Sequence, residues 1–166
     1  MIIIKRNTNG DSRVATTVPT FWEFKDANES HIRDVEAMMK EFAGIISYKG
    51  RKHDWSKEAE PYQSMFYREL SSTIEGKMNF MDGKWAEFHY ANERHHLLRN
   101  VPDDVNLFDV LEMIADCVCA GMARTGEVRP LEIDNSILVK AMNNTVDLAK
   151  SMIEVMNEDG AEWRKE

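Results

Sequence analysis

Cysteine is scarce in this sequence, with two residues of this type among 166. Both of them, Cys117 and Cys119, lie in one apolar run, and on a helix their side chains would point about 200° apart. We therefore do not expect them to pair with each other, and we interpret them as reduced thiols in the core of a cytoplasmic protein. A zinc site built on paired cysteines would need a second pair, which the sequence lacks.

Long hydrophobic runs are also missing. No apolar segment reaches the roughly 18 residues that a membrane-spanning helix needs. The stretch from Met1 to Lys5 is too short, and becomes polar too soon, to resemble a secretory signal. We expect a protein of the cytoplasm without a membrane partner. The sequence also contains no internal repeat and no low-complexity tract.

Positive charge is in the minority, because 21 Lys and Arg residues face 29 Asp and Glu residues, for a formal net charge of −8. An acidic surface repels the phosphates of nucleic acids, so general DNA or RNA binding is not expected. A small anionic substrate remains compatible with this charge if a metal or a local cationic patch holds it. Hydrophobic residues make up 43% and charged residues 30%, the balance of a globular domain, and the oligomeric state stays open, a homo-oligomer included.

The first 18 residues are predicted to form a β-hairpin. Ile2 to Ile4 favour one strand, and Val14 to Thr17 could form its partner. Asn9 and Gly10 lie between them, and both tolerate the positive φ of a tight hairpin turn.

From Thr20 onward the spacing of apolar residues is helical. Thr20 and Glu23 match a capping box for a short helix, and apolar residues recur at intervals of three and four over 28–48. Further helices are expected over 54–70, 84–98 and 106–124, and from Asp134 or Asn135 to about Met156, with a loop over 71–83. The prediction is one mainly α domain, with the hairpin at 1–18, a helical core at 20–156 and a charged tail at 157–166.

Histidine and aspartate carry the clearest chemical pattern. The adjacent pair His53 and Asp54 can bind one metal through an imidazole nitrogen and a carboxylate oxygen, although such a dipeptide often arises by chance. Asp116 interrupts an apolar helix, where a carboxylate needs a metal or another partner to offset its desolvation. The alternative is a buried aspartate paired with an arginine or capped by backbone donors. His31 lies beside the apolar stripe, where a core-edge histidine bonded to a carbonyl is the alternative.

A second group of histidines precedes Asp116. His89, Asn92 and His96 stand at i, i+3 and i+7, so they would share one helix face, with His95 about 100° away from His96. A solvated polar face is the alternative interpretation of this group.

The order of His31, His53, Asp54 and Asp116 resembles that of the HD-domain superfamily, in which a histidine, a His-Asp pair and an aspartate follow one another along the chain. The histidines at 89, 95 and 96 fall between the His-Asp pair and the last aspartate, where members with two metals have their extra histidines.

The stretch from His53 to Lys57 is similar to the HD-x-[GS]-K form of some members, including the HD-GYP phosphodiesterases. The Gly-Tyr-Pro element of that group is missing, so a cyclic dinucleotide substrate is not supported. Residues 19–153 also resemble small uncharacterised HD-like proteins of phages and their bacterial hosts, which implies a bacterial or phage-infected cytoplasm.

The resemblance implies an HD-like helical bundle that hydrolyses a nucleotide or another small phosphoester. One or two divalent ions (Mn, Fe, Co, Ni, Zn or Mg) would lower the pKa of a water and stabilise charge on a phosphoryl oxygen. The implied metal ligands are His31, His53, Asp54, His89, His96 and Asp116, with His95 as an alternative to His96. Asp54 would bridge the ions if both positions are filled.

Catalytic and substrate-binding roles fall on neighbours of these ligands. The predicted catalytic residues are Asp54, Lys57, Glu58 and Glu60. Lys57 lies one helical turn beyond Asp54 and is expected to contact a phosphate, and Glu58 or Glu60 would be a general acid or base. The predicted substrate-binding residues are Lys57, Asn92 and Arg124, with Arg129, Asn143 and Asn144 as weaker candidates.

Two other functions fit the same pattern. Some HD-domain oxygenases, such as myo-inositol oxygenase, use this order of ligands for two irons, and iron content with dioxygen uptake would identify them. A non-catalytic protein that binds or sequesters a nucleotide would retain its ligand without turnover.

Overall fold

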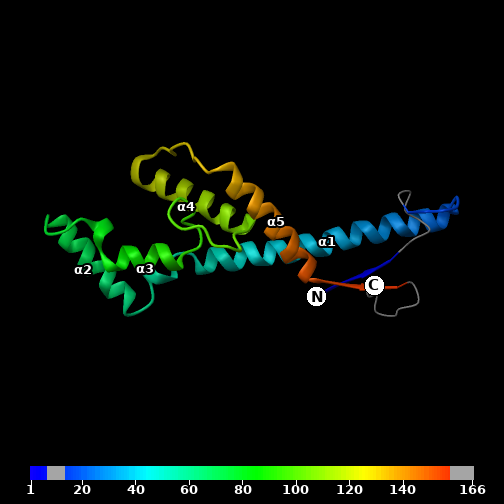
Figure 1. The fold of residues 1–166 in the computed structure, drawn as a ribbon, viewed down its shortest axis with the longest axis horizontal. Helices are drawn as coiled ribbons and strands as arrows, with labels where there is room; N and C mark the ends of the chain where they lie inside the picture. Colours follow the sequence, from blue (N-terminus) through cyan, green and yellow to red (C-terminus); the bar gives the residue numbers. More distant parts are fainter. Residues whose placement is uncertain (7–13, 158–166) are drawn as a thin grey trace. The chain divides into compact units, whose positions relative to one another are not determined.

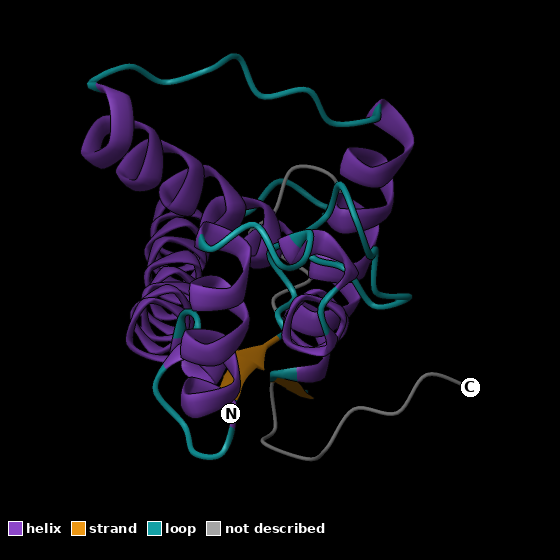
Figure 2. Ribbon diagram, turned by 90° about the vertical axis from the view of Figure 1, so that its left-hand side faces the viewer, coloured by secondary structure: helices purple, strands orange, loops and turns teal. Residues whose placement is uncertain are grey.

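A computed structural model describes residues 1–6 and 14–157 (Figure 1). Helices dominate the described residues, accompanied by two short strands (Figure 2), which confirms the predicted mainly α fold class. The chain divides into two compact units, Met1–Gly44 with Val146–Glu166 and Ile45–Thr145. In the described part of the chain, no helix combines the length and the apolar character that a membrane crossing requires.

The strand pair of the first unit joins distant segments. Strand β1 (Ile2–Lys5) pairs in parallel with β2 (Ile153–Met156), and Ile2 lies opposite Ile153. The predicted hairpin is therefore wrong. Val14 to Thr17 form no strand, and the predicted turn at Asn9 and Gly10 lies outside the described residues.

The partner of β1 comes from a segment that was predicted to be helical. The last helix, α5 (Asn135–Ser151), ends before Met156, and Ile153 and Val155 enter β2 instead. Both are β-branched, which favours an extended backbone once the helix has ended.

Helix α1 (Phe21–Lys52) unites two predicted helices. The capping box at its start is confirmed: the Thr20 N–H donates to Glu23 Oε2 at 2.7 Å, and the Glu23 N–H donates to Thr20 Oγ1 at 3.3 Å. The helix ends just before Asp54, whose φ of 53° lies in the left-handed region. This conformation turns the chain directly after His53.

The second unit contains the remaining short elements around a small core. Its elements are the 3₁₀ helices Trp55–Lys57 and Phe80–Asp82, α2 (Tyr62–Ile74), α3 (Lys84–Asn92), α4 (Leu107–Thr125) and the part of α5 up to Thr145. Leu97, Val105, Val110, Met113 and Ala141 form a buried cluster. The helix predicted over 54–70 instead begins at Tyr62 and continues to Ile74, into the predicted loop. The helix predicted over 84–98 ends at Asn92, before the histidine pair at 95 and 96.

Stacked aromatic rings fix α3 against α2. Phe66 stacks on Trp85 with ring centroids 4.0 Å apart, and Trp85 stacks on His89 at 4.4 Å. The Glu69 carboxylate accepts a hydrogen bond from the backbone N–H of Trp85 at 3.0 Å. A Cβ on Gly83 would overlap that carboxylate, so a larger residue there would displace the Glu69 side chain from this hydrogen bond.

Helix α4 starts and stops at clear local signals. Asn106 and Asp109 form a reciprocal capping box, and Gly126 follows the helix with a φ of 74°. Between them, Asp109, Glu112 and Asp116 recur at intervals of three and four, so all three carboxylates share one face of the helix.

Candidate metal centre

A histidine–carboxylate cluster forms in the second unit where three segments meet: the end of α1, α3 with the turn after it, and α4. Its members are His53, Asp54, His89, His95, His96, Glu112 and Asp116.

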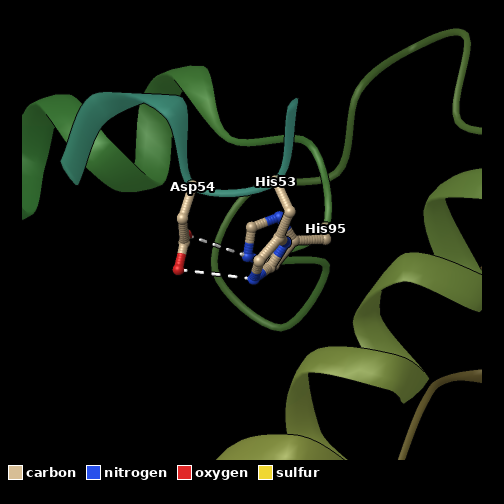
Figure 3. A group of neighbouring side chains, drawn as sticks. All are labelled: His53, Asp54 and His95. Atoms are coloured by element: carbon tan, nitrogen blue, oxygen red, sulfur yellow. Dashed lines mark ion pairs between the residues drawn. The ribbon is translucent and has the colours of Figure 1, made fainter. Parts of the chain in front are cut away.

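Asp54 lies at the centre of this cluster. Its Oδ2 is 3.3 Å from His53 Nε2, and its Oδ1 is 3.6 Å from His95 Nε2 (Figure 3). The same Oδ1 is 3.5 Å from His89 Nε2, and His89 Nε2 is 2.7 Å from His96 Nε2. Two sets of ligand atoms meet the geometry of a metal site, because the atoms within each set lie within 4.8 Å of one another. One set comes from His53, Asp54 and His95, the other from Asp54, His89 and His96. Asp54 belongs to both sets.

Three atoms of the cluster are buried without a hydrogen-bond partner in the described structure: Asp54 Oδ1, His95 Nδ1 and His95 Nε2. Burying a polar atom without a partner is costly, so such atoms are rare in native proteins. A divalent ion would satisfy Asp54 Oδ1 and His95 Nε2 together, since carboxylate oxygen and imidazole nitrogen are ordinary ligands of such ions. The residues present therefore fit a metal.

Glu112 stands behind two of the histidines. Its Oε1 is 3.2 Å from His53 Nδ1 and 3.3 Å from His95 Nδ1, the second contact without hydrogen-bond alignment. Both rings consequently present Nε2 to Asp54. A carboxylate behind a metal-binding histidine fixes the orientation of its ring and raises its basicity.

Ser56 orients His89 in a similar way. The Ser56 hydroxyl donates to Glu93 Oε1 at 2.7 Å and lies 2.8 Å from His89 Nδ1. A hydroxyl has a single proton, so at the second contact it accepts from His89 Nδ1–H. His89 Nε2 then carries the lone pair that points towards Asp54 and His96, as a metal ligand requires.

A chain of ion pairs extends from Glu112 Oε2, the oxygen that does not face the histidines. Lys49 Nζ lies 2.9 Å from Glu112 Oε2 and 2.6 Å from Asp109 Oδ1. Arg94 Nε and Nη2 donate to the two oxygens of Asp109 at 2.9 and 2.8 Å. Asp109 is fully buried, so these contacts hold α4 to the end of α1 and to the turn after α3.

The environment moves the pKa of several members. Burial and the nearby His96 lower the pKa of His89 to about 3, and burial and His95 lower that of His96 to about 4. Both rings are therefore neutral near pH 7, the form that binds a metal. Burial raises the pKa of Glu112, but the facing His95 ring and the hydrogen bond from Lys49 lower it more, to about 2. Burial lowers the pKa of His95, but Glu112 raises it more, so the net shift is upward.

Four of the predicted ligands, His53, Asp54, His89 and His96, come together in the two sets. Asp116 Oδ1 lies 3.4 Å from His53 Nε2, at the margin of the cluster. The preference for His96 over His95 assumed that α3 continued to residue 98. It ends at Asn92, and the following turn brings both histidines to Asp54.

His31 is not part of the cluster. Its side chain is exposed on α1, within the first unit. His31 is absent from both sets of ligand atoms among the described residues, so its role as a ligand stays a prediction.

The predicted catalytic residues divide into two groups. Lys57 forms an ion pair with Asp54, one turn earlier in the chain. Glu58 and Glu60 are exposed, and Glu60 accepts a hydrogen bond from Ser64 at 2.8 Å, so neither is part of the cluster.

The predicted substrate-binding residues other than Lys57 lie apart from the cluster. Asn92 is exposed and donates to the Phe88 carbonyl at 2.8 Å. Arg124 is exposed and lies about 12 Å beyond Asp116 along α4. Arg129 and Asn143 are exposed as well. Asn144 donates to the carbonyls of Asp103 and Val105, which is a structural role.

Sequence reasoning missed several residues around the cluster. Glu112 and Asp109 precede Asp116 by one and two helical turns, and this spacing was the signal that could have revealed them. The sequence pattern also indicated the wrong carboxylate as the buried one, because Asp109 is fully buried whereas the Asp116 side chain is 27% exposed. Cys119 is exposed and is therefore no core thiol.

These observations define a class of protein, a helical protein with a histidine–carboxylate cluster whose donor atoms suit divalent ions. A family model described as a family of unknown function, DUF5662, matches residues 20–159, and the chain belongs to this family. Comparison with curated proteins and with solved structures finds no match to the chain.

Proposed function

We propose that the chain is a metal-dependent phosphohydrolase of the HD type that acts on a nucleotide or another small phosphoester. The observation that supports this proposal is the place of Asp54, whose carboxylate is shared by two sets of ligand atoms. A carboxylate between two histidine pairs is suited to bridge two ions, an arrangement used for the attacking and leaving oxygens in phosphoryl transfer.

Each histidine has an assigned place in this proposal. His53 and His95 would hold one ion with Asp54, and His89 and His96 would hold the other. Imidazole and carboxylate ligands suit Mn, Fe, Co, Ni or Zn. Ions bound there would lower the pKa of water and stabilise negative charge on a phosphoryl oxygen.

Lys57 contributes a positive charge next to the two sets of ligand atoms. Its ammonium is paired with Asp54, and its side chain is 35% exposed. If Asp54 served as a metal ligand, the Lys57 ammonium would be available to an oxygen of the substrate phosphate. It contributes one of several contacts to the phosphoryl charge.

The decisive variant is Asp54→Ala, compared with Lys57→Ala. We expect Asp54→Ala to abolish both metal binding and phosphate release, because it removes the ligand common to both sets. Lys57→Ala should keep the metal and lose only part of the activity. Calorimetric titration with Mn, Co and Zn, phosphate release from a panel of nucleotides and small phosphoesters, and a thermal melt of each variant measure these effects.

Glu75→Ala is the matched control, because Glu75 is an exposed carboxylate paired only with Lys77 among the contacts described. It should behave like the unchanged protein. Full activity of Asp54→Ala on a confirmed substrate would refute the proposed role of the cluster. Dioxygen uptake by the iron-loaded protein without phosphate release would favour the oxygenase alternative.

A further inference from the structure

A cavity of about 290 Å³ adjoins the histidine–carboxylate cluster, between the last turns of α1 and the part of α4 from Phe108 to Cys119. All its lining residues belong to the second unit. Three members of the cluster, His53, Glu112 and Asp116, are among its lining residues. Its volume is at the lower end of those of small-molecule sites. The cavity and the cluster are therefore parts of one continuous site.

Apart from Lys49 and these three members of the cluster, the lining is apolar. The residues there are Ile46, Gly50, Phe108, Leu111, Ala115 and Cys119. A sugar or the polar edge of a nucleobase placed against this surface would lose hydrogen bonds to water without replacement. An apolar ring would lose none and would gain from the removal of its surface from water.

The charged residues of the lining argue against an anion inside the cavity. Lys49 is its one cation among the described residues, and its ammonium is already held by Asp109 at 2.6 Å and by Glu112 at 2.9 Å. Glu112 and Asp116 add negative charge. A phosphate would therefore be repelled from the cavity, and its place is at the metal positions beside Lys57.

We propose that this cavity binds an uncharged, apolar part of the substrate, of the size of an aromatic ring, while the phosphoryl group lies on the ions. The inference rests on the proposed function for the position of the phosphate. It narrows the substrate class to phosphoesters of apolar or aromatic alcohols, in preference to esters whose organic part is a polar sugar or base.

Two phosphonates that are not hydrolysed test the preference directly. Phenylphosphonate and methylphosphonate carry the same charged group and differ only in the group that would enter the cavity. We expect the metal-loaded protein to bind phenylphosphonate at least about ten-fold more tightly in a calorimetric titration, the ratio that burial of a ring supports.

The variant Ala115→Leu should abolish this preference, because its added atoms would occupy the cavity that Ala115 lines. It should leave the affinities for the metal and for methylphosphonate unchanged. Ala123→Leu is the matched control, an exposed alanine of the same helix that does not line the cavity. An equal affinity for both phosphonates in the unchanged protein would overturn the inference.

Cys119 offers a readout that needs neither metal nor turnover, because its exposed thiol lines the cavity. In a Cys117→Ala background, benzyl alcohol should slow the alkylation of Cys119 in the metal-free protein, and Ala115→Leu should remove this protection. Protection without any metal binding would refute the proposed function and leave the apolar site standing. Metal and methylphosphonate binding without protection or ring preference would refute the apolar site alone.

Discussion

At the scale of single residues, the backbone conformation of Asp54 brings its carboxylate next to the ring of His53. Its φ of 53° lies in the left-handed region, which residues other than glycine seldom adopt and which aspartate tolerates better than most. The chain turns there, so that His53 and Asp54, adjacent in sequence, offer Nε2 and Oδ2 to each other at 3.3 Å. A helical continuation through Asp54 would point the two side chains about 100° apart.

Glu112 is the residue whose loss tests how this geometry is maintained. In Glu112→Gln the amide lacks the negative charge that faces His53 and His95. We therefore expect the affinity for the ion that His53, Asp54 and His95 would hold to fall about 10–100-fold. Competitive titration with Zn and the visible spectrum of bound Co measure the change. Glu132→Gln, at an exposed carboxylate in the connector after α4, is the control. Unchanged affinity and an unchanged Co spectrum would show that Glu112 does not position the two rings.

At the scale of the element, α4 joins the core to the cluster. Val110 and Met113 are buried in the apolar core, while Asp109, Glu112 and Asp116 share a different face. Burial raises the pKa of Asp109, but hydrogen bonds from Arg94 and Lys49 lower it more, so the net shift is downward. The ionised form of Asp109 therefore stabilises the folded state, and α4 depends on it for its attachment.

This dependence predicts how Asp109→Asn changes the pH profile of stability. A carboxyl group with a lowered pKa in the folded state contributes stability above its unfolded pKa, and the contribution disappears as the pH falls through the folded pKa. We expect the variant to be less stable by about 3 kcal/mol between pH 5 and 8, with a difference that shrinks below about pH 4. Urea unfolding of both proteins across this range measures it, and a difference that grew towards low pH would contradict the assignment.

At the scale of the whole molecule, the parallel pairing of β1 with β2 links segments near the two ends of the sequence within the first unit. A parallel pair needs a long connection between its strands, here all of the chain from α1 to α5. A local hairpin would have needed only the turn at Asn9 and Gly10. The connection makes the first unit dependent on both ends of the chain.

A pair of introduced cysteines distinguishes the two pairings. Ile4 lies opposite Val155 in the register, and neighbouring strands are about 4.8 Å apart, within the Cα separation that a disulfide allows. With Cys117 and Cys119 replaced by alanine, we expect Ile4→Cys with Val155→Cys to cross-link on oxidation. Ile4→Cys with Ala15→Cys, the pair that a hairpin would align, should stay reduced. Mass spectrometry of digested protein identifies the bond, and the reverse result would restore the hairpin.

Features that depend on nearby residues could be predicted from the sequence. The capping box at Thr20 and Glu23 and the helix around Asp116 appear where periodicity and capping residues indicated them, because their hydrogen bonds span three or four positions. The His53-Asp54 pair was recognisable for the same reason, since its two donors are neighbours in the chain. The mainly helical fold class follows from the same local signals.

Tertiary packing decided the rest. Whether β1 pairs with residues 14–17 or with β2 depends on a segment some 150 positions away, which no local pattern encodes. The turn after Asn92 brings both His95 and His96 to Asp54, where an extended helix would have separated them. In the sequence, nothing distinguishes Glu112 from other acidic residues on a helix. Its role arises from contacts with His53 and Lys49, which lie about sixty positions away in the chain. Burial and charge pairing are properties of such contacts, and only the folded chain makes them.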